Sequence, residues 1–380
     1  MDLSQYRSAL AHHWFFCVSG GERVCEVIFA ILGNPDVFCI AGNRDSLPPT
    51  LKGCSFTTSF INRLPGSRRW YRYYVPLFPL AVELLDLRNY DLVVSSDAAA
   101  IKGVIPSPEA CHVCYCHSPM RYAWNMFQEY REARRGLPRA AFSLAMHYLR
   151  LWDQSAASRV DYFVANSETV RQRIRRFYRR EATVIHPPCE LDRFQVSNRV
   201  EDYYLFVGRL VPYKRADLAV EVFSRNGKRL LVVGSGPEEK ALKAKAARNV
   251  EFLGWVGDDE LAKLYATCKA VVFPGEEDFG IVPVEAQASG RPVIAYVKGG
   301  ARETILPDVT GIFFREQTPQ SLDAALRAFE AVQDSFDPPV IRLNAEQFRA
   351  SRFREEFERF LGRCLDEHKL QTRGSSENVG

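Results

Sequence analysis

The sequence predicts an α/β protein with two doubly wound parallel-sheet domains, and three observations carry that expectation. Short apolar runs alternate with amphipathic helical stretches along most of the chain, which is the βα pattern of parallel sheets. The 380 residues exceed what one hydrophobic core usually holds, and 47% of them are hydrophobic, which is enough for two cores. The segment His186-Pro187-Pro188 interrupts the pattern near the middle, as a linker does.

Five predicted strands precede the linker, at residues 8–14, 37–41, 91–96, 111–115 and 162–166. The pair Gly20-Gly21 follows the first of them and leads into a helix predicted over 22–32. Glycines between a strand and a helix let the backbone approach a ligand closely, in front of the helix amides. A plain tight turn is the alternative for this fragment.

A second series follows the linker, with strands predicted at 203–207, 229–234, 250–253, 271–274, 293–296 and 311–314. The last helix, predicted over 344–365, carries four phenylalanines at helical spacing: Phe348, Phe353, Phe357 and Phe360. Residues 371–380 are polar and include glycine and serine, which predicts a disordered tail.

Two carboxylates bracket one strand-to-helix junction of the second series. Glu277 falls on a loop after a predicted strand, and Glu285 falls about one turn inside a helix predicted over 281–289. The free amides of residues 280–282 lie between them, at the positive end of the helix dipole. The junction therefore suits an anion flanked by hydroxyl groups, as in a nucleotide sugar. An ordinary helix start with acidic residues is the alternative.

Two cations lie on the loop after the first strand of this series. Arg209 and Lys214 both follow the strand 203–207 at its carboxyl end, where open α/β sheets bind ligands. Both cations can therefore face one diphosphate.

Together these features resemble the retaining nucleotide-sugar glycosyltransferases of family 4. The resemblance covers most of the chain and rests on seven motifs in order, each of them modest alone. The motifs are Gly20-Gly21-Glu22-Arg23, Tyr115-Cys116-His117-Ser118-Pro119, Val164-Ala165-Asn166-Ser167, Gly208-Arg209 with Lys214, Gly234-Ser235-Gly236-Pro237, Phe252-Leu253-Gly254-Trp255 and the two glutamates. The amino-acid sequence from Tyr115 to Trp124 is most similar to that of bacterial mannosyltransferases that build O-antigen and exopolysaccharide chains.

The resemblance implies the GT-B fold, in which two Rossmann-like domains face a cleft and the final helix crosses back to the first domain. The implied parts are an acceptor-side domain at 1–187, a nucleotide-sugar domain at 188–345, a crossover helix at 346–370 and the tail at 371–380. The implied reaction is retaining transfer of a hexose, with GDP-mannose as the preferred donor and a lipid-linked oligosaccharide of surface polysaccharide synthesis as the acceptor. A UDP-sugar with a small soluble acceptor is the alternative.

The resemblance also implies roles for single residues. Arg209 and Lys214 hold the departing diphosphate, Glu277 holds sugar hydroxyls, Glu285 holds the ribose and His117 lies beside the donor sugar. Breaking the bond to the diphosphate develops negative charge on the leaving group, so fixed cations are the main catalytic requirement. The other donor contacts are expected at Gly20, Gly21, Gly208, Gly234, Leu253, Trp255, Val256, Phe279, Gly280, Ile281 and Val282.

No Asp-x-Asp motif of the metal-dependent glycosyltransferases occurs, and the two cations serve where those enzymes use Mg²⁺. We therefore expect neither a metal nor a cofactor. The resemblance implies a front-face mechanism, in which the donor phosphate assists deprotonation of the acceptor. His117 as a general base and His117 as a strand-end residue bonded to backbone are the alternatives.

Ten cysteines are too few for a disulfide scaffold in a chain of this length. Cys111, Cys114 and Cys116 with His112 and His117 form a conceivable zinc cluster. Their alternation is that of a buried strand, however, and no second Cys-x-x-Cys pair completes four ligands. The sequence therefore favours a reduced core strand.

Charge is unevenly distributed along the chain. Residues 1–187 carry 23 Lys and Arg against 16 Asp and Glu, a net +7, and the remainder carries 27 against 30, a net −3. Arginines mix with aromatic residues at 67–74 and 171–180, which suits the surface of an anionic membrane. A solvated helix face competes with this interpretation, and nucleic acid is disfavoured because no nucleic-acid motif accompanies the charge. The sequence has neither an 18-residue apolar run nor a signal-peptide pattern, so we expect a cytoplasmic protein, peripheral at the inner face of the membrane.

Three other functions compete. Gly234-Ser235-Gly236 after a predicted strand hints at an NAD-linked oxidoreductase, but Glu239 stands where the third glycine of that fingerprint belongs. A nucleotide-sugar epimerase or a sugar phosphorylase would share the fold. An inert scaffold that binds a nucleotide sugar is disfavoured by the intact glutamates and cations.

Overall fold

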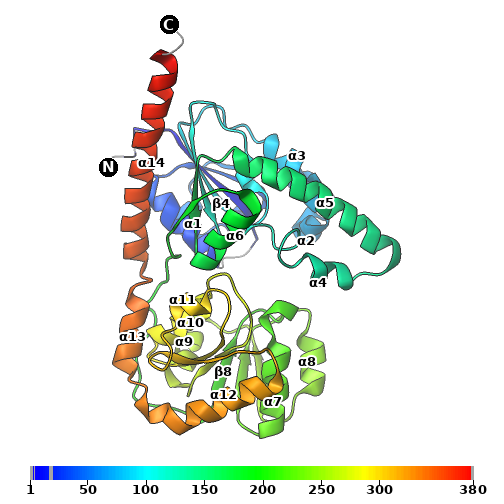
Figure 1. The fold of residues 1–380 in the computed structure, drawn as a ribbon, viewed down its shortest axis with the longest axis vertical. Coiled ribbons are helices and arrows are strands. Elements are labelled where there is room, and N and C mark those ends of the chain that lie inside the picture. Colours follow the sequence, from blue (N-terminus) through cyan, green and yellow to red (C-terminus); the bar gives the residue numbers. More distant parts are fainter. Residues whose placement is uncertain (1–2, 4, 17–19, 378–380) are drawn as a thin grey trace. The chain divides into compact units, whose positions relative to one another are not determined.

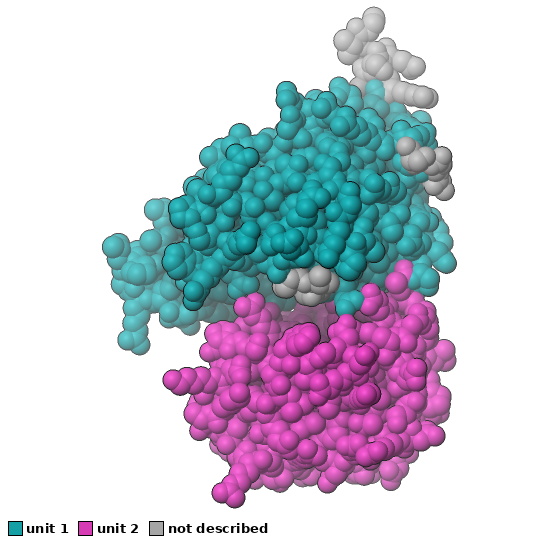
Figure 2. All heavy atoms as spheres, turned by 180° about the vertical axis from the view of Figure 1, so that it is seen from behind, with its two compact units in different colours: residues 1–188, 351–380 teal, residues 189–350 magenta. Residues whose placement is uncertain are grey.

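A computed structural model describes residue 3, residues 5–16 and residues 20–377, and the chain divides into two compact units. Unit 1 comprises residues 1–188 and 351–380, and unit 2 comprises residues 189–350 (Figure 2). The division after Pro188 lies one residue beyond the linker position at Pro187. Each unit contains one parallel sheet, as the alternating pattern predicts.

Unit 1 is built on a seven-stranded parallel sheet with the order β3-β2-β1-β4-β5-β6-β7. The strands are β1 (Ser8–Phe15), β2 (Asp36–Gly42), β3 (Phe56–Thr58), β4 (Leu92–Asp97), β5 (Cys111–Cys116), β6 (Tyr162–Ala165) and β7 (Ala182–Val184). Successive residues of β1 face opposite cores: Leu10 packs in one hydrophobic cluster, whereas Ala9 and Ala11 pack in the other. The sheet is therefore covered on both faces, as parallel sheets generally are.

Helices of unit 1 follow the strands in the doubly wound pattern (Figure 1). They are α1 (Gly20–Ile31), α2 (Ser67–Trp70), α3 (Phe78–Glu83), α4 (Phe127–Glu132), α5 (Gly136–Ser158), α6 (Glu168–Tyr178) and α14 (Ala350–Glu377). Short 3-10 turns are η1 (Arg44–Ser46), η2 (Pro49–Leu51), η3 (Phe60–Arg63), η4 (Tyr71–Leu77) and η5 (Ile101–Gly103). The start of α6 shows why the chain turns helical there, because the Ser167 hydroxyl caps it by accepting from the Val170 N–H.

Unit 2 has a six-stranded parallel sheet with the order β10-β9-β8-β11-β12-β13. Its strands are β8 (Tyr204–Val207), β9 (Leu230–Val233), β10 (Val250–Gly254), β11 (Val271–Phe273), β12 (Val293–Tyr296) and β13 (Gly311–Phe314). Its helices are η6 (Pro212–Lys214), α7 (Ala216–Asn226), α8 (Glu239–Lys245), α9 (Asp258–Thr267), α10 (Ile281–Ala288), α11 (Ala301–Thr304), α12 (Pro319–Val332), η7 (Gln333–Ser335) and α13 (Pro338–Glu346). All six strands lie within a residue or two of their predicted positions.

The C-terminal region differs from the single helix predicted over 344–365. Two helices occupy it, because α13 ends at Glu346 and α14 begins at Ala350. The helix also continues through Glu377, where a disordered tail from 371 is predicted, and residues 378–380 lie outside the described part. Two contacts to the rest of unit 1 lie past residue 365: His368 Nε2 lies 3.0 Å from the Glu109 carbonyl oxygen, and the Lys369 ammonium lies 4.9 Å from the Tyr6 ring.

Candidate active site

Four neighbouring strands of unit 2 end in the loops that carry the predicted donor site. The strand order β10-β9-β8-β11 brings these ends side by side on the carboxyl edge of the parallel sheet. Arg209 and Lys214 follow β8, Gly234 follows β9, Trp255 follows β10 and Glu277 follows β11. Open α/β sheets bind ligands at this edge. The residues predicted in this unit from separate motifs therefore share one edge of one sheet.

Glu277 forms an ion pair with Lys214. The Lys214 ammonium contacts Glu277 Oε1, and only 15% and 16% of the two side chains are exposed. A Cβ at Gly299, where φ is +69°, would lie 2.1 Å from the Glu277 carbonyl oxygen. A Cβ at Gly275 would lie 2.8 Å from the Tyr213 carbonyl oxygen, beside the turn that carries Lys214. Glycine at both positions therefore lets the loops pack closely enough to hold the pair.

The loops beside this pair differ in exposure. Arg209 is exposed and has no ion-pair partner among the described residues. Trp255, just beyond β10, is 81% exposed. Between them, a Cβ at Gly234 would lie 2.1 Å from the Gly208 carbonyl oxygen, so the ends of β8 and β9 are in close backbone contact. One cation, one indole ring and a tight glycine turn therefore face solvent on adjacent strand ends.

Glu285 lies in the second turn of α10, where two side chains hold its carboxylate. Arg193 Nη2 donates to Oε1 at 2.6 Å, and the Tyr265 hydroxyl donates to Oε2 at 2.9 Å. Arg193 also pairs with Asp258 at 3.2 Å. Burial and then the Glu285 charge raise the pKa of Tyr265 well above its usual value, which keeps the hydroxyl protonated as a donor. Arg193 and Tyr265 were not predicted from the sequence, because these long-range contacts leave no local pattern.

The helix α10 begins at Ile281, as predicted, and Gly280 precedes it with a φ of +86° that favours glycine. Ile281 and Val282 are half-buried in its first turn, where backbone N–H groups have no acceptor within the helix. Phe279 behaves differently from its neighbours, because its side chain is buried with its ring 5.5 Å from that of Phe348. A donor contact of the Phe279 side chain, as predicted, does not fit this burial.

In unit 1, His117 directly follows β5. Its N–H donates to the Asp97 carbonyl at 2.8 Å, and its ring Nε2 lies 2.8 Å from the Ser96 hydroxyl. A Cβ at Gly21 would lie 3.9 Å from His117 Cε1, so the start of α1 lies beside this ring. The pair Gly20-Gly21 is predicted as a turn before the helix, but α1 begins at Gly20 itself. Glu22 in the first turn favours this earlier start through the helix dipole, and residues 17–19 lie outside the described part.

Ser96 links His117 to a second, fully buried histidine. The Ser96 hydroxyl lies 3.1 Å from His12 Nδ1, and His12 Nε2 lies 3.6 Å from Glu22 Oε1. Burial lowers the pKa of His12, but the nearby Cys25 and Glu22 outweigh burial and raise the pKa to about 10. The chain Glu22–His12–Ser96–His117 therefore places a buried positive charge one hydroxyl away from His117 at neutral pH. His12 and Ser96 lack a motif that sequence analysis could use.

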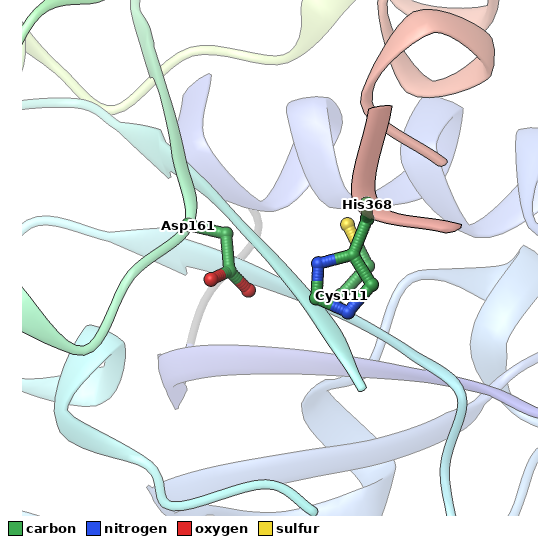
Figure 3. A group of neighbouring side chains, drawn as sticks. All are labelled: Cys111, Asp161 and His368. Carbon is green, nitrogen blue, oxygen red and sulfur yellow. The ribbon is translucent and has the colours of Figure 1, made fainter. Parts of the chain in front are cut away.

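All six residues of β5 are buried, as expected of a core strand rather than a zinc cluster. One different group with metal-ligand chemistry occurs in the described part of the chain: Cys111, Asp161 and His368, with ligand atoms within 4.8 Å of one another (Figure 3). Burial raises the pKa of the Cys111 thiol, and Asp161 already accepts from the His112 N–H at 2.8 Å. Cys111 begins β5 and His117 follows its end, so this group lies away from the candidate site.

Two family models match consecutive parts of the chain. Glycosyltransferase Family 4 matches residues 33–193, and Glycosyl transferases group 1 matches residues 190–336. An uncharacterized glycosyltransferase of Methanocaldococcus jannaschii is 36% identical over 132 residues, which are 32% of this chain and 34% of that protein. A D-inositol 3-phosphate glycosyltransferase of Geodermatophilus obscurus is 31% identical over 210 residues, which are 46% of this chain and 47% of that protein. Both matches span less than half of the relative's own length.

Two solved structures share the fold over nearly the whole chain. An Anabaena protein in complex with UDP and glucose has a TM-score of 0.69 at 17% identity, covering 94% of this chain and 100% of its own. Sucrose-phosphate synthase from Thermosynechococcus elongatus has a TM-score of 0.70 at 17% identity, covering 95% of this chain and 100% of its own. The two family models together extend from residue 33 to residue 336, one on each parallel-sheet unit. The chain therefore has the GT-B fold, and the two family models support a glycosyltransferase.

Proposed function

We propose that the chain is a hexosyltransferase that moves a hexose, with retention of configuration, from a nucleotide diphosphate sugar to a hydroxyl acceptor. The observation that carries the proposal is the Lys214–Glu277 ion pair, held at the carboxyl edge of the unit 2 sheet. With Arg209 exposed on the same loop, this edge offers two positive charges for a diphosphate and one carboxylate for sugar hydroxyls.

The proposed reaction breaks the bond between the anomeric carbon and the diphosphate oxygen. The acceptor oxygen bonds to that carbon on the same face, and the acceptor proton passes to the departing phosphate oxygen, so atoms and charge balance. Negative charge grows on the diphosphate, and Arg209 and Lys214 stabilise it there. A bound diphosphate competes with Glu277 for Lys214 and so releases the Glu277 carboxylate toward the sugar. His117, oriented by Ser96, is proposed to bind the donor sugar.

The nucleotide part is assigned to the other loops of the same edge. Glu285 is proposed to hold the ribose, and its fixed pairing with Arg193 and Tyr265 orients the carboxylate before any hydroxyl arrives. The exposed strand end at Leu253 and Trp255 is proposed to contact the base. The first-turn amides of α10 are proposed to contact the phosphates.

We propose that the transfer needs neither a metal nor a cofactor. Arg209 and Lys214 supply the charge that a divalent ion supplies to a diphosphate in metal-dependent enzymes. The two side chains also differ in kind, since an exposed arginine can bind two phosphate oxygens whereas a lysine acts as a point charge.

The preferred donor is GDP-mannose, and the preferred acceptor is a lipid-linked oligosaccharide of surface polysaccharide synthesis. This preference rests on the sequence similarity of the region from Tyr115 to Trp124 to mannosyltransferases. The competing candidate is a UDP-sugar with a small soluble acceptor. The Anabaena structure with UDP and the D-inositol 3-phosphate glycosyltransferases among the relatives favour that candidate.

A donor screen by thermal shift tests the proposal, with GDP-mannose and UDP-glucose side by side and NAD as a control. A ligand at 100 times its dissociation constant adds about 2.7 kcal/mol of stability, which raises the melting temperature measurably. We expect a shift with one nucleotide sugar and none with NAD. Incubation of that sugar without an acceptor then distinguishes transfer from epimerisation, because only an epimerase converts the sugar. Failure of every nucleotide sugar to shift the transition would contradict the proposal.

A further inference from the structure

The helix α5 carries an apolar stripe on its outer side. Leu137, Leu144 and Leu151 are 82%, 72% and 60% exposed, and Tyr148 is about half exposed. Their spacing of seven, four and three residues places them on one side of the helix. The opposite side is also apolar, because Met146 and Leu149 of α5 are buried in the core of unit 1. A helix that is apolar on both sides normally has a second partner on its outer side.

A second stripe lies on and beside α3. Leu77, Leu80 and Leu84 are 41%, 53% and 66% exposed at helical spacing. Trp152 Nε1 of α5 donates to Glu83 Oε1 of α3 at 2.8 Å, so the two stripes belong to neighbouring helices. Figure 1 shows α2, α3, α4 and α5 grouped on one side of unit 1. We call Leu77, Leu80, Leu84, Leu137, Leu144 and Leu151 together the leucine face.

Arginines accompany the leucine face. The segment leading to α3 carries four of them, Arg63, Arg68, Arg69 and Arg72, each exposed. Trp70 and Tyr73 of the same segment are 54% and 82% exposed. The one acidic residue between Arg63 and Leu84 is Glu83, which Arg159 pairs at 3.0 Å. This half of the face is therefore apolar and strongly basic.

The approach to α5 is basic as well. Arg131, Arg134, Arg135 and Arg139 precede or open the helix, and the acidic residues of this stretch are Glu129 and Glu132 on α4. Within α5 itself the one acidic residue is Asp153, which is buried and bonded to Lys102. The outer side of α5 therefore presents leucines next to a net positive charge and no carboxylate.

The other arginine-rich segment lacks this combination. The sequence predicts the same kind of membrane contact for 171–180. In α6, however, the apolar residues Val170, Ile174 and Tyr178 are buried. The Phe177 ring stacks on Trp124 at 4.8 Å. The exposed residues of α6 are Arg171, Gln172, Arg175 and Arg176, so its outer side has charge without exposed apolar surface.

We propose that the leucine face is a docking surface for an anionic lipid bilayer. The leucines and Trp70 would enter the headgroup region, and the surrounding arginines would contact the lipid phosphates. No described helix is both long and apolar enough to cross a membrane, so the contact is peripheral. The inference goes beyond the proposed transfer reaction, and its test uses neither donor nor acceptor.

Sedimentation with vesicles tests the proposal. The full chain is mixed at low salt with vesicles of phosphatidylglycerol and phosphatidylcholine, and separately with phosphatidylcholine alone. We expect binding to the anionic vesicles, and about tenfold weaker binding for Leu144→Ser, because an exposed leucine loses its burial in lipid. Leu343→Ser in α13 is the matched control, since Leu343 is 71% exposed and lies in the other unit. It should bind like the wild type.

Three outcomes would overturn the proposal. Equal vesicle binding by Leu144→Ser and Leu343→Ser would show that the leucine face does not bind the membrane. A second outcome is normal binding by Leu144→Ser together with loss of binding when five arginines are replaced by serine: Arg173, Arg175, Arg176, Arg179 and Arg180. That result would show that α6, rather than the leucine face, contacts the membrane. A wild-type dimer in analytical ultracentrifugation that Leu144→Ser converts to a monomer, with no vesicle binding, would make the face an interface between two copies. Nucleotide-sugar thermal shifts of all variants show separately whether the proposed donor site is intact.

Discussion

Lys214 and Glu277 neutralise each other across two loops that end the neighbouring strands β8 and β11. Both side chains are mostly buried, so each charge is compensated by the other while no ligand is bound. A diphosphate that takes the lysine therefore changes the environment of the carboxylate at the same moment. In the proposed reaction, this ion pair therefore couples donor binding to the exposure of Glu277 to the sugar.

Lys214→Ala and Arg209→Ala are each expected to lower turnover about 100-fold or more, since each removes a cation from charge that grows in the transition state. The measurement is kcat and kcat/KM with saturating acceptor. Arg225→Ala, an exposed residue that pairs with Glu221, is the control and should retain wild-type rates. Near-normal rates in both site variants would contradict the assignment.

Replacing Glu277 and replacing Glu285 should have different effects on turnover and on nucleotide affinity. Glu277→Ala is expected to lower turnover more than nucleotide affinity, because its carboxylate is proposed to hold the sugar. Glu285→Ala should also weaken nucleotide binding, since it removes the proposed ribose acceptor and leaves Arg193 and Tyr265 without their carboxylate. Titration calorimetry with the nucleoside diphosphate measures the difference. Equal affinities of the two variants would remove this division of roles.

Transfer activity is expected to survive EDTA, because Arg209 and Lys214 are proposed to supply the positive charge that a metal ion would otherwise provide. Activity of the untreated and the EDTA-treated enzyme should agree, and added Mg²⁺ or Mn²⁺ should not increase it. A requirement for either ion would show that the two cations are insufficient.

Stability should fall above neutral pH through His12. Its pKa is about 10 in the folded chain against 6.5 ordinarily, so its contribution is fully present below pH 6.5 and is lost as the pH rises through about 10. Glu22→Gln removes one charge that raises this pKa, and urea unfolding between pH 6.5 and 10 should show a flatter decline. The ring also faces Cys25 and His13, and burial followed by repulsion from neighbouring histidines holds the pKa of His13 well below 6.5.

Glu26→Gln on the same helix is the matched control for this experiment, because the Glu26 carboxylate accepts from Thr50 on the surface. It should keep the pH dependence of the wild type. A Glu22→Gln variant with an unchanged pH dependence would show that His12 is not charged by this pair.

Lys102→Ala should destabilise the protein by about 3–5 kcal/mol, because it leaves buried carboxylates without their cation. Lys102 is fully buried and pairs with Asp153 and with Asp97, the latter at 3.3 Å. Urea unfolding measures the loss, and Lys52→Ala, at an exposed position, should change stability by less than about 0.5 kcal/mol. A loss below 1 kcal/mol for Lys102→Ala would contradict a charged pair there.

Local patterns were enough to predict the placement of the two glutamates and both sheets except the edge strands β3 and β7, which are three residues long and were not predicted. An apolar run ended by glycine or proline marks a buried strand whatever its neighbours are, so β11 and α10 lie where the sequence puts them. The partners of Glu285 could not be predicted in this way. Arg193 lies 92 residues away, and only the packed fold brings its guanidinium to the carboxylate.

The sequence also did not predict which side of each arginine-rich segment faces solvent. Arginines mix with aromatic residues in α6 and in 67–74 alike, yet α6 buries Tyr178 and stacks Phe177 on Trp124, whereas the other segment exposes Trp70 and Tyr73. Which side of a helix meets the core depends on what packs against it. The sequence pattern also did not predict the break at residues 347–349, which separates α13 from α14.

A substitution at Gly299 would displace the carboxylate of Glu277 without itself contacting a substrate. Any side chain there collides with the Glu277 backbone, because its Cβ would lie 2.1 Å from the carbonyl oxygen. Relief of that collision displaces Glu277 and with it the contact to Lys214. Mutational tolerance of this loop is therefore set by backbone spacing, and engineering of donor preference has more freedom at the exposed Trp255 than at the loop that supports the ion pair.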